Sequence, residues 1–569
     1  MAALSKSLAL TRALPATASI LARRTVYVMS PRDNFMSDYQ LTLPSFTRRA
    51  EQLFGHKTVT SDCGDRVDVT TYADYVKSCR KVGGILEELG IGQGHRVASF
   101  AWNNINHLEL WYGVPNASRV LHTLNIRLFA EQITYVVNHA ENEAIFVDKS
   151  LFKLLWPLVD TFKTVKHIIV MDDGVPGDLP DDPRILNYEE LKASVPEVEF
   201  DVKDERMPAS MCYTSGTTGM PKAVVYTHRS QYLHTMGILS ADSLGVRETD
   251  CVLPVVPMFH ANGWGLPFAT VAVGSDLVFP SRNMTPKHLA MLMEKYKVTI
   301  AAGVPTIWMG VLPELKGRDL SALRGIPVGG SAVPLSLSKA YEKATGLPIM
   351  QAWGMTETSP LGSVCSISSK HANAPQETID HLRQSIGYPV VGVDMRIANL
   401  ETGEDLPWDG ETTGELEVRG PWIASSYYNP DQPADNFKAD DWMATGDVAA
   451  ISEDGYVYIS DRSKDLIKSG GEWIGSVEVE NIIMSHPKVK EAAVVAVRSK
   501  RWMERPMACV VLADDEELTH EELIEFLEPR MAKWWLPDVT VFVDEIPKTS
   551  VGKFSKKDLR KQFEHVVVA

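Results

Sequence analysis

A run of hydroxyl and glycine residues at positions 213–222 carries the clearest chemical signal in the sequence, Tyr-Thr-Ser-Gly-Thr-Thr-Gly-Met-Pro-Lys. Its two glycines, Gly216 and Gly219, let the backbone turn tightly and approach a ligand. The same turn supplies hydroxyl groups and one positive charge, a set that suits a polyphosphate: Thr214, Ser215, Thr217, Thr218 and Lys222. No Gly-Lys-Ser/Thr triplet follows the glycines, so a Walker A loop is not predicted. By itself, such a loop is more often a solvated turn than a binding site.

Further motifs give this loop a context, because they follow it in a set order along the chain. They are Met258-Phe-His260, Gly329-Gly-Ser331, Trp353-Gly-Met-Thr-Glu357, Gly414-Glu-Leu-Glu-Val-Arg-Gly420, Thr445-Gly-Asp447, Asp461-Arg-Ser-Lys-Asp465 and Lys548-Thr-Ser-Val-Gly-Lys553. Such an order is implausible by chance. Over about residues 40–560 the chain resembles the adenylate-forming superfamily of acyl-CoA synthetases, luciferases and peptide-synthetase adenylation domains. Two residues depart mildly from that pattern: Trp353 where many members have Tyr, and Asp461 where Gly is frequent.

The resemblance implies an ATP site and gives roles to its residues. Asp447 is expected to accept hydrogen bonds from the two ribose hydroxyls, which suits a carboxylate, and Arg462 to be the second ribose contact. Trp353 is expected to stack on adenine or to line the acyl tunnel with its flat indole face. A turn Asp, a surface ion pair and a core aromatic are the ordinary alternatives. The remaining residues assigned to the nucleotide pocket are Gly329, Gly330, Ser331, Gln351, Gly354 and Met355.

Phosphate chemistry falls to a second group of residues implied by the resemblance. Thr356 and Glu357 are expected to hold the α-phosphate, and Glu357 together with Thr214 a magnesium ion that bridges phosphate oxygens. Lys553 is expected to reach the phosphate and carboxylate oxygens as charge builds on the transferring adenylyl group. A lysine in a basic tail of this kind is otherwise usually solvated. The predicted catalytic residues are therefore Lys553, His260, Thr356 and Glu357.

The acyl and coenzyme A groups are expected at the remaining motifs. His260 stands where acyl-CoA ligases carry a histidine near the carboxylate, although a satisfied core histidine is the ordinary alternative. The substrate pocket is predicted to include Trp264, Val304 and Pro305. The indoles of Trp264 and Trp353 would fill much of the channel, which favours acids of short to medium length. Lys464 is expected at the hinge of a mobile small domain. Rotation there would bring a glycine-rich loop against the pantetheine of coenzyme A: Ser469, Gly470, Gly471 and Glu472.

These side chains must be held by α/β layers, because short Val/Ile-rich runs alternate with amphipathic stretches between about residues 40 and 460. Strands are predicted at 97–101, 144–147, 167–170 and 299–302, and a helix at 75–89. Beyond about residue 465 the runs at 491–497, 507–512 and 539–543, with a helix at 520–532, predict a small α+β domain. The fold class is therefore α/β: a large N-terminal body of several subdomains at 36–463, and a small mobile C-terminal lid domain at 464–569.

Composition narrows the class of protein further. With 569 residues, 44% of them apolar and 23% charged, the chain is predicted to be globular. A net charge of −16 makes nucleic acid an unexpected partner. Six cysteines without a CxxC pair indicate no disulfide framework and a reducing compartment. No run of 18 apolar residues occurs, so no membrane span is expected.

The first 32 residues differ from the rest, because five cations are scattered among Ala, Leu, Ser and Thr and no acid appears before Asp33. This composition is typical of a mitochondrial transit peptide, so residues 1–35 are predicted to be a targeting segment and the mature protein to lie in the mitochondrial matrix. A disordered start, or initiation at Met29 or Met36, is the alternative and would leave the protein cytoplasmic.

The resemblance implies an acid–CoA ligase that joins a fatty or related carboxylic acid to coenzyme A through an acyl-adenylate. ATP, Mg²⁺ and coenzyme A are the expected cofactors, and small molecules the expected partners, with a homodimer left open. A long-chain fatty acyl-CoA ligase is the nearest alternative. A luciferase-like oxygenase shares the motifs, whereas a non-catalytic binding protein is expected to lack Lys553, Glu357 or Asp447, all of which are present.

Overall fold

The computed structural model describes residues 36–214, 220–430, 434–462, 464–469, 472–549 and 552–568. The chain divides into two compact units, residues 1–40 and residues 41–569, and every element named below belongs to the second. The predicted targeting segment, residues 1–35, lies outside the described residues. None of the described helices is long and apolar enough to span a lipid bilayer.

A seven-stranded sheet carries the strand that leads into the phosphate loop. Its strands are parallel except for the last pair, in the order β7 (Ile185–Asn187), β6 (His167–Met171), β5 (Asn142–Asp148), β3 (Arg96–Phe100), β4 (Val120–Thr123), β8 (Pro208–Tyr213) and β9 (Ala223–Thr227). The loop of residues 214–222 therefore joins the antiparallel strands β8 and β9 at one end of this sheet.

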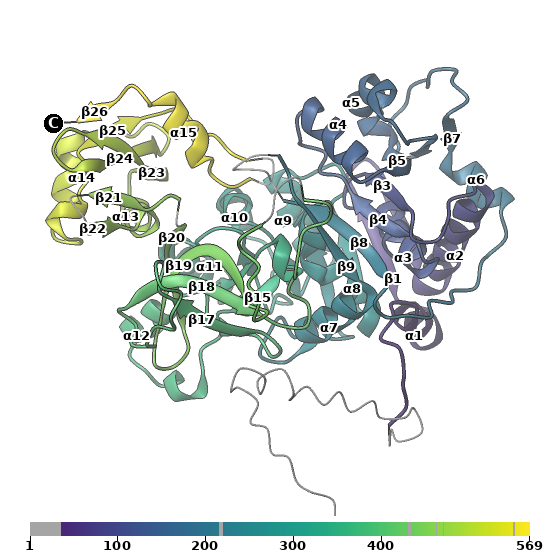
Figure 1. The fold of residues 1–569 in the computed structure, drawn as a ribbon, viewed down its shortest axis with the longest axis horizontal. Helices are drawn as coiled ribbons and strands as arrows, with labels where there is room; N and C mark the ends of the chain where they lie inside the picture. The colour runs from purple at the N-terminus through teal and green to yellow at the C-terminus, as the bar shows by residue number, and fades with distance from the viewer. Residues whose placement is uncertain are drawn as a thin grey trace, which may run out of the picture. The chain divides into compact units, whose positions relative to one another are not determined.

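A second sheet has five strands, parallel except for the last pair, and includes the strand labelled β1 in Figure 1. Its order is β12 (Ile300–Ala302), β10 (Cys251–Pro254), β11 (Asp276–Phe279), β1 (Thr58–Asp62) and β2 (Val67–Thr71). Strand β10 ends just before the 258–264 segment, so this sheet positions His260 and Trp264.

Two four-stranded sheets hold most of the other motifs. The first runs β13 (Pro327–Gly329), β14 (Met350–Gly354), β15 (Leu361–Val364) and β16 (Tyr388–Pro389). The second is antiparallel throughout, in the order β17 (Asp394–Ala398), β18 (Thr413–Arg419), β19 (Met443–Ile451) and β20 (Val457–Arg462).

The helices of this large body connect and cover its sheets. They are α1 (Pro44–Phe54), α2 (Tyr72–Glu88), α3 (Ile105–Asn116), α4 (Ala130–His139), α5 (Phe152–Leu155), α6 (Tyr188–Ser194), α7 (His228–Leu239), α8 (Leu266–Val273), α9 (Pro286–Lys295), α10 (Pro305–Val311), α11 (Leu335–Thr345) and α12 (Gln376–Leu382). Short 3₁₀ turns include η4 (Lys149–Leu151), η5 (Trp156–Thr161), η6 (Ala261–Gly265), η7 (Leu312–Leu315), η8 (Thr356–Thr358) and η9 (Ser369–His371).

The C-terminal elements form a sheet of their own. Its order is β22 (Glu472–Ile474), β21 (Ile467–Ser469), β24 (Met503–Leu512), β23 (Val489–Ser499) and β26 (Val567–Val568), and β25 (Val539–Phe542) also pairs with β24. The helices here are α13 (Ser476–Ile483), α14 (His520–Leu527) and α15 (Lys556–Gln562), with the turn η10 (Lys533–Trp535). Two apolar clusters composed only of residues beyond 466 fill its two faces.

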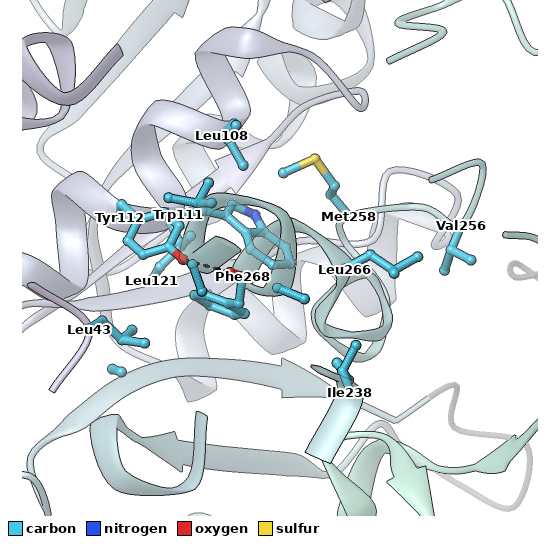
Figure 2. Close-up of a cluster of buried hydrophobic side chains, with 14 of the residues drawn as sticks. Leu43, Leu108, Trp111, Tyr112, Leu121, Ile238, Val256, Met258, Leu266 and Phe268 are labelled. Carbon is cyan, nitrogen blue, oxygen red and sulfur yellow. Dashed lines mark hydrogen bonds between the residues drawn. The ribbon is translucent and has the colours of Figure 1, made fainter. Parts of the chain in front are cut away.

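A large cluster of buried apolar side chains joins α3 to α8 and packs against turn η6. Trp111 and Tyr112 on α3 pack on Phe268 of α8, with ring centroids 5.0 and 5.4 Å from it (Figure 2). The Tyr112 hydroxyl donates to the Phe268 carbonyl at 3.1 Å. A Cβ at Gly263 would stand 3.3 Å from the Trp111 ring, so this core directly underlies turn η6.

The α/β fold class and its predicted strands are confirmed, with boundaries shifted by a few residues. The predicted helix at 520–532 is too long, because α14 ends at Leu527. Pro529 explains the end, because proline has no backbone N–H to donate into the helix and its ring clashes with the carbonyl four residues earlier. The mobility of the C-terminal part and its boundary at 463/464 stay predictions.

Candidate active site

A cavity of about 500 Å³ collects most of the predicted site residues from segments far apart in the sequence. Those that line it are Thr214, Lys222, His260, Trp264, Gly329, Gly330, Trp353, Gly354, Met355, Thr356, Glu357, Arg462, Lys464 and Lys553. Phosphate-loop, histidine, glycine and C-terminal lysine motifs therefore meet at one place. Ser215, Gly216, Thr217, Thr218, Gly219, Gly470, Gly471 and the side chain of Glu472 lie outside the described residues.

Several predicted residues do not line the cavity. Gln351 is buried and ties two backbone segments together: it accepts from Val333 N at 2.9 Å and donates to the Ser385 carbonyl at 3.1 Å. Ser469 accepts from Arg505 at 3.1 Å within the C-terminal sheet. In this arrangement both side chains have protein partners remote in sequence. Their contacts with nucleotide or coenzyme A stay predictions.

The predicted substrate-pocket residues Val304 and Pro305 also do not line the cavity. Pro305 is buried in the first turn of α10, where its fixed φ suits a helix start. Val304 packs behind the wall, with its Cγ1 3.4 Å from where a Cβ at Gly330 would lie. Ser331 is exposed and does not line the cavity either.

A corner in β19 orients Asp447. Gly446 adopts a φ of +76°, a conformation that favours glycine. The Thr445 hydroxyl donates to the Leu416 carbonyl at 2.8 Å and accepts from Asp447 N at 3.1 Å. The β19–β20 register then sets Asp447 directly opposite Arg462.

Asp447 lies just behind the cavity wall and joins two lining residues. Its carboxylate is 2% exposed, pairs with Arg462 at 2.6 Å, and accepts from the Trp353 indole N–H at 2.9 Å. The three residues predicted to bind the nucleoside therefore lie together, and Trp353 also holds the carboxylate in place. That hydrogen bond is an addition to the predicted stacking role.

Turn η8 presents Thr356 and Glu357 to the cavity. Glu357 is 5% exposed, and its Oε1 accepts from the Tyr427 hydroxyl at 2.6 Å. The Tyr226 hydroxyl donates to the Thr356 carbonyl at 2.7 Å, which fixes the turn to β9. Burial, reinforced by the neighbouring carboxylate, raises the pKa of Tyr427 above its ordinary value, so the phenol keeps its proton and donates.

The donor set at this end of the cavity fits a magnesium ion. Thr214 offers a hydroxyl and Glu357 a carboxylate, which are the hard oxygen ligands that Mg²⁺ prefers. Throughout the described ranges, no cluster of three or more His, Cys, Asp or Glu side chains could hold a metal ion by itself. An ion here would therefore depend on nucleotide phosphates for further ligands.

Lys553 and His260 both line the cavity, and the charge of the lysine acts on the imidazole. Burial, helped by the charge of Arg462, lowers the pKa of Lys553 to about 8 against the opposing attraction of Asp447 and Glu357. Burial, with Lys553 nearby, lowers the pKa of His260 to about 3. The imidazole is therefore neutral at physiological pH, whereas the lysine is still mostly charged.

Trp264 forms part of the apolar side of the cavity. Its backbone has a φ of +57°, which is uncommon for a bulky residue and marks a constrained position. A Cβ at Gly329 would stand 3.3 Å from the indole and 2.6 Å from the Ala352 carbonyl, so only glycine fits there. Trp264 and Gly329 therefore border one space, and their roles toward the substrates stay predictions.

Other lining residues are not among the predicted ones. They are Met220, Leu244, Ala261, Pro327, Ala352, Pro360, Leu361, Tyr427, Asp435, Asn436, Ala444, Thr445 and Gly446. Most are apolar or backbone contributions without a chemical signature. Tyr427 could have been found, because it opens the aromatic pair Tyr427-Tyr428 close after the 414–420 motif.

Comparisons with known proteins agree with this geometry. The profile of the AMP-binding enzyme family matches residues 46–428, and that of the AMP-binding enzyme C-terminal domain matches residues 478–553. A 3-methylmercaptopropionyl-CoA ligase of Ruegeria pomeroyi is 43% identical over 88% of this chain and 93% of its own length. A long-chain-fatty-acid–CoA ligase of Thermus thermophilus is 43% identical over 93% and 97%, and a medium-chain-fatty-acid–CoA ligase of Ectopseudomonas oleovorans 38% over 93% and 97%.

Solved structures share the same fold. The anthranilate CoA ligase AuaEII, in complex with anthranoyl-AMP, superposes with a TM-score of 0.81 at 24% identity and covers 94% of this chain and 99% of its own. ATP-bound MatB from Rhodopseudomonas palustris gives 0.79 at 24% identity over 92% and 99%. With the family profile matching most of the sequence, the chain belongs to the AMP-binding enzyme family.

Proposed function

We propose that the protein is an AMP-forming acyl-CoA ligase whose substrates are a carboxylic acid, ATP and coenzyme A. In the first step a carboxylate oxygen attacks the α-phosphorus of ATP, and the bond from that phosphorus to the bridging oxygen breaks to release pyrophosphate. In the second step the thiol sulfur of coenzyme A attacks the acyl carbon. The bond to the AMP oxygen breaks, and the thiol proton is lost to the departing phosphate or to solvent.

One observation carries this proposal: Lys553, Glu357 and the Asp447–Arg462 pair, from four separate motifs, gather at one cavity. Among the described residues that line the cavity, no nucleophile is paired with a base as a covalent enzyme intermediate would require. Catalysis would instead come from positioning and from electrostatic stabilisation of the charge that grows on the phosphate. A buried lysine can supply the electrostatic stabilisation, and side chains held by hydrogen bonds can supply the positioning.

The chain's own residues would divide the work along the cavity. Asp447 would accept from the ribose hydroxyls, while Trp353 keeps the carboxylate in place. Lys553 would bring the acid's carboxylate and the α-phosphate together by attracting both. His260, being neutral, would donate a hydrogen bond or shape the acyl entrance without adding charge. A bound magnesium ion, held by Glu357 and Thr214, would neutralise phosphate charge.

For the acid itself, we propose a short- to medium-chain fatty or related carboxylic acid. The indole of Trp264 and the packed Gly329 restrict the apolar side of the cavity. The curated relatives include ligases named for both medium-chain and long-chain fatty acids, so their names do not decide the length. The cavity's restriction therefore supports the shorter chains.

The activity is tested by following the two half-reactions separately in purified protein. Pyrophosphate release should depend on both acid and ATP, and thioester formation should require coenzyme A in addition. Lys553→Ala should abolish pyrophosphate release yet still convert a supplied acyl-adenylate to acyl-CoA, because the lysine serves only the first step. Equal loss in both half-reactions would remove Lys553 from its assigned role, and no acid-dependent pyrophosphate from wild type would refute the ligase.

Chain length is tested with straight-chain acids of two to sixteen carbons. Each methylene that the channel accepts should add at most about 0.8 kcal/mol, so kcat/KM should climb a few-fold per carbon and then fall. Trp264→Ala should move the optimum to longer acids. An unchanged optimum in a well-folded variant would take Trp264 out of the pocket, and a wild-type preference for palmitate would refute the short channel.

A further inference from the structure

Tyr427 touches two parts of the phosphate machinery at once. Its hydroxyl donates to Glu357 Oε1 at 2.6 Å, a short hydrogen bond to an ionised carboxylate. The face of the same ring lies under the Lys222 ammonium, 4.8 Å from Nζ to the ring centroid. Glu357 belongs to turn η8 and Lys222 to the end of the phosphate loop, so Tyr427 is a single side chain shared by two separate motifs.

The segment that carries Tyr427 is itself attached to both motifs through the backbone. Ala424 N donates to the Glu357 carbonyl at 2.8 Å, and Tyr428 N donates to the Ala223 carbonyl at 2.9 Å. These two bonds flank Tyr427 on either side. The backbone around Tyr427 is therefore held by Glu357, which its hydroxyl contacts, and by the residue that follows Lys222, which its ring contacts.

The ring is also held from the opposite direction. Phe437 packs edge-on against it, with centroids 5.1 Å apart and planes at 70°. Asn436 Nδ2 donates to the Tyr427 hydroxyl at 3.4 Å, which leaves that hydroxyl's own proton directed at Glu357. Tyr427 and Asn436 both line the cavity, so these contacts lie at the site and not in the remote core.

We propose that Tyr427 is a positioning residue, whose hydroxyl fixes the Glu357 carboxylate for a magnesium–nucleotide complex and whose ring holds the Lys222 ammonium at the cavity. The inference rests on the proposed function, since it names how that site receives ATP. The hydrogen bond from Tyr427 is made at Oε1 of Glu357, and the same carboxylate lines the cavity in which a ligand would bind. Hydrogen-bond partners of metal-binding carboxylates are typically worth 10–100-fold in metal affinity or activity.

Two substitutions separate the two contacts. Tyr427→Phe removes only the hydroxyl and keeps the ring under Lys222, whereas Tyr427→Leu removes both. Tyr428→Phe is the matched control, because the neighbouring ring packs on His139, 5.8 Å away, and not on Glu357. Because Tyr427→Phe leaves the packing on Phe437 in place, its thermal unfolding midpoint should stay close to that of wild type.

The measurement is binding of a fluorescent ATP analogue to the full chain without acid or coenzyme A, titrated with Mg²⁺. Tyr427→Phe should raise the Mg²⁺ concentration for half-maximal binding by roughly tenfold or more, with metal-free binding unchanged. Tyr427→Leu should also weaken metal-free binding, because Lys222 is no longer held. In a Glu357→Gln background, Tyr427→Phe should add nothing further, since both changes act through one carboxylate.

Wild-type Mg²⁺ dependence in folded Tyr427→Phe would overturn the inference, and so would an additive effect in the Glu357→Gln background. An equal shift in Tyr428→Phe would do the same, because that variant leaves Glu357 untouched. These outcomes differ from failure of the proposed function, in which the wild-type protein itself binds no nucleotide or forms no acyl-CoA from any acid.

Discussion

Lys553 carries its charge in a buried place, and its surroundings decide the pH at which that charge is lost. The charged groups that face it are Arg462, Asp447 and Glu357, and His260 stays neutral beside it. Burial and Arg462 together outweigh the two carboxylates, so the pKa falls to about 8. A lysine is cationic below its pKa, so adenylation should be supported at neutral pH and lost as the pH rises.

The expected pH profile follows from this sign. kcat/KM for ATP, which reports the free enzyme, should fall above about pH 8 by up to tenfold per pH unit. His260 should add no step between pH 5 and 9, because its pKa lies near 3. In Lys553→Arg the guanidinium stays charged, so the alkaline fall should disappear even if the rate is lower. A flat wild-type profile between pH 7 and 10 would contradict the assignment.

The sequence predicts which side chains gather at the site better than it predicts the hydrogen bonds between them. Trp353, Asp447 and Arg462 were all predicted to bind the nucleoside, and they do lie together. The hydrogen bond from Trp353 to Asp447 was not foreseen, because it joins residues 94 positions apart. The hydrogen bonds of Gln351 were not foreseen for the same reason: nothing local in the sequence reveals that its amide pairs with Val333 N and the Ser385 carbonyl.

Strand β20 uses its two faces for two different purposes. Arg462 pairs with Asp447, whereas the preceding Asp461 turns to the C-terminal part, as the alternation of a strand requires. Asp461, 1% exposed, accepts from the backbone N–H of Ser476 at 2.6 Å and from its hydroxyl. Lys556 donates to the same hydroxyl at 2.5 Å and pairs with Glu480 at 2.7 Å. Asp461, a mild departure from the family pattern in the sequence, thus binds the first residue of α13.

Asp461→Asn is therefore expected to destabilise the C-terminal part. Both carboxylate oxygens accept hydrogen bonds, one from Arg462 N and the other from Ser476. The amide keeps the shape but replaces one acceptor with an NH₂ donor, which leaves a buried partner unpaired at a cost of about 1–3 kcal/mol. Urea unfolding followed by limited proteolysis of residues beyond 466 measures it. Asp514→Asn is the control, because its side chain is 92% exposed and its ion pair with Lys490 spans 3.5 Å, so little change is expected. Indistinguishable variants would mean that the Asp461 cluster contributes no stability.

Elements were predicted where hydrophobic periodicity is strong and missed where pairing decides. The buried parallel strands β3, β5 and β6 read directly as apolar runs. The sheet of β17–β20 was not predicted as a unit, because its order depends on register between distant segments and on bulges at Glu415–Glu417 and Val448–Ala449. Those bulges help to aim Asp447, so the least predictable element carries a central site residue.

For the whole chain, the N-terminal segment and the catalytic unit are proposed to act independently. Deleting residues 1–32 should leave acyl-CoA formation unchanged, since the segment shows no clear apolar periodicity with which to pack. The same residues fused to a reporter should direct it into mitochondria, because cations without acids are typical of such addresses. Cytosolic retention of the reporter would refute the localisation, and lost activity in the deletion would show that the segment supports the fold.

The mobility proposed for the C-terminal domain can be tested by fixing it where it stands. Thr306 Oγ1 donates to the Gly552 carbonyl at 3.3 Å. A Cβ at position 552 would lie 3.5 Å from Thr306 Oγ1, the atom that a cysteine sulfur would replace, so a disulfide between the two positions is within reach. Thr306→Cys with Gly552→Cys, once oxidised, should keep Lys553 in the cavity. The backbone at 552 has a φ of +83°, so cysteine there adds strain of about 1–2 kcal/mol, and the single variants control for it.

The oxidised double variant should still release pyrophosphate from acid and ATP in a single turnover, because the first step uses the arrangement that the bond preserves. Acyl-CoA formation should be lost, since the domain could no longer rotate about Lys464 to present its glycine-rich loop to the pantetheine. Reduction should restore the thioester step, and each single variant should carry out both steps whatever the redox state. A cross-linked protein that makes acyl-CoA at the rate of its reduced form would show that one domain arrangement serves both chemistries, and Lys553 would then have to stay beside the acyl-adenylate while the thiol attacks.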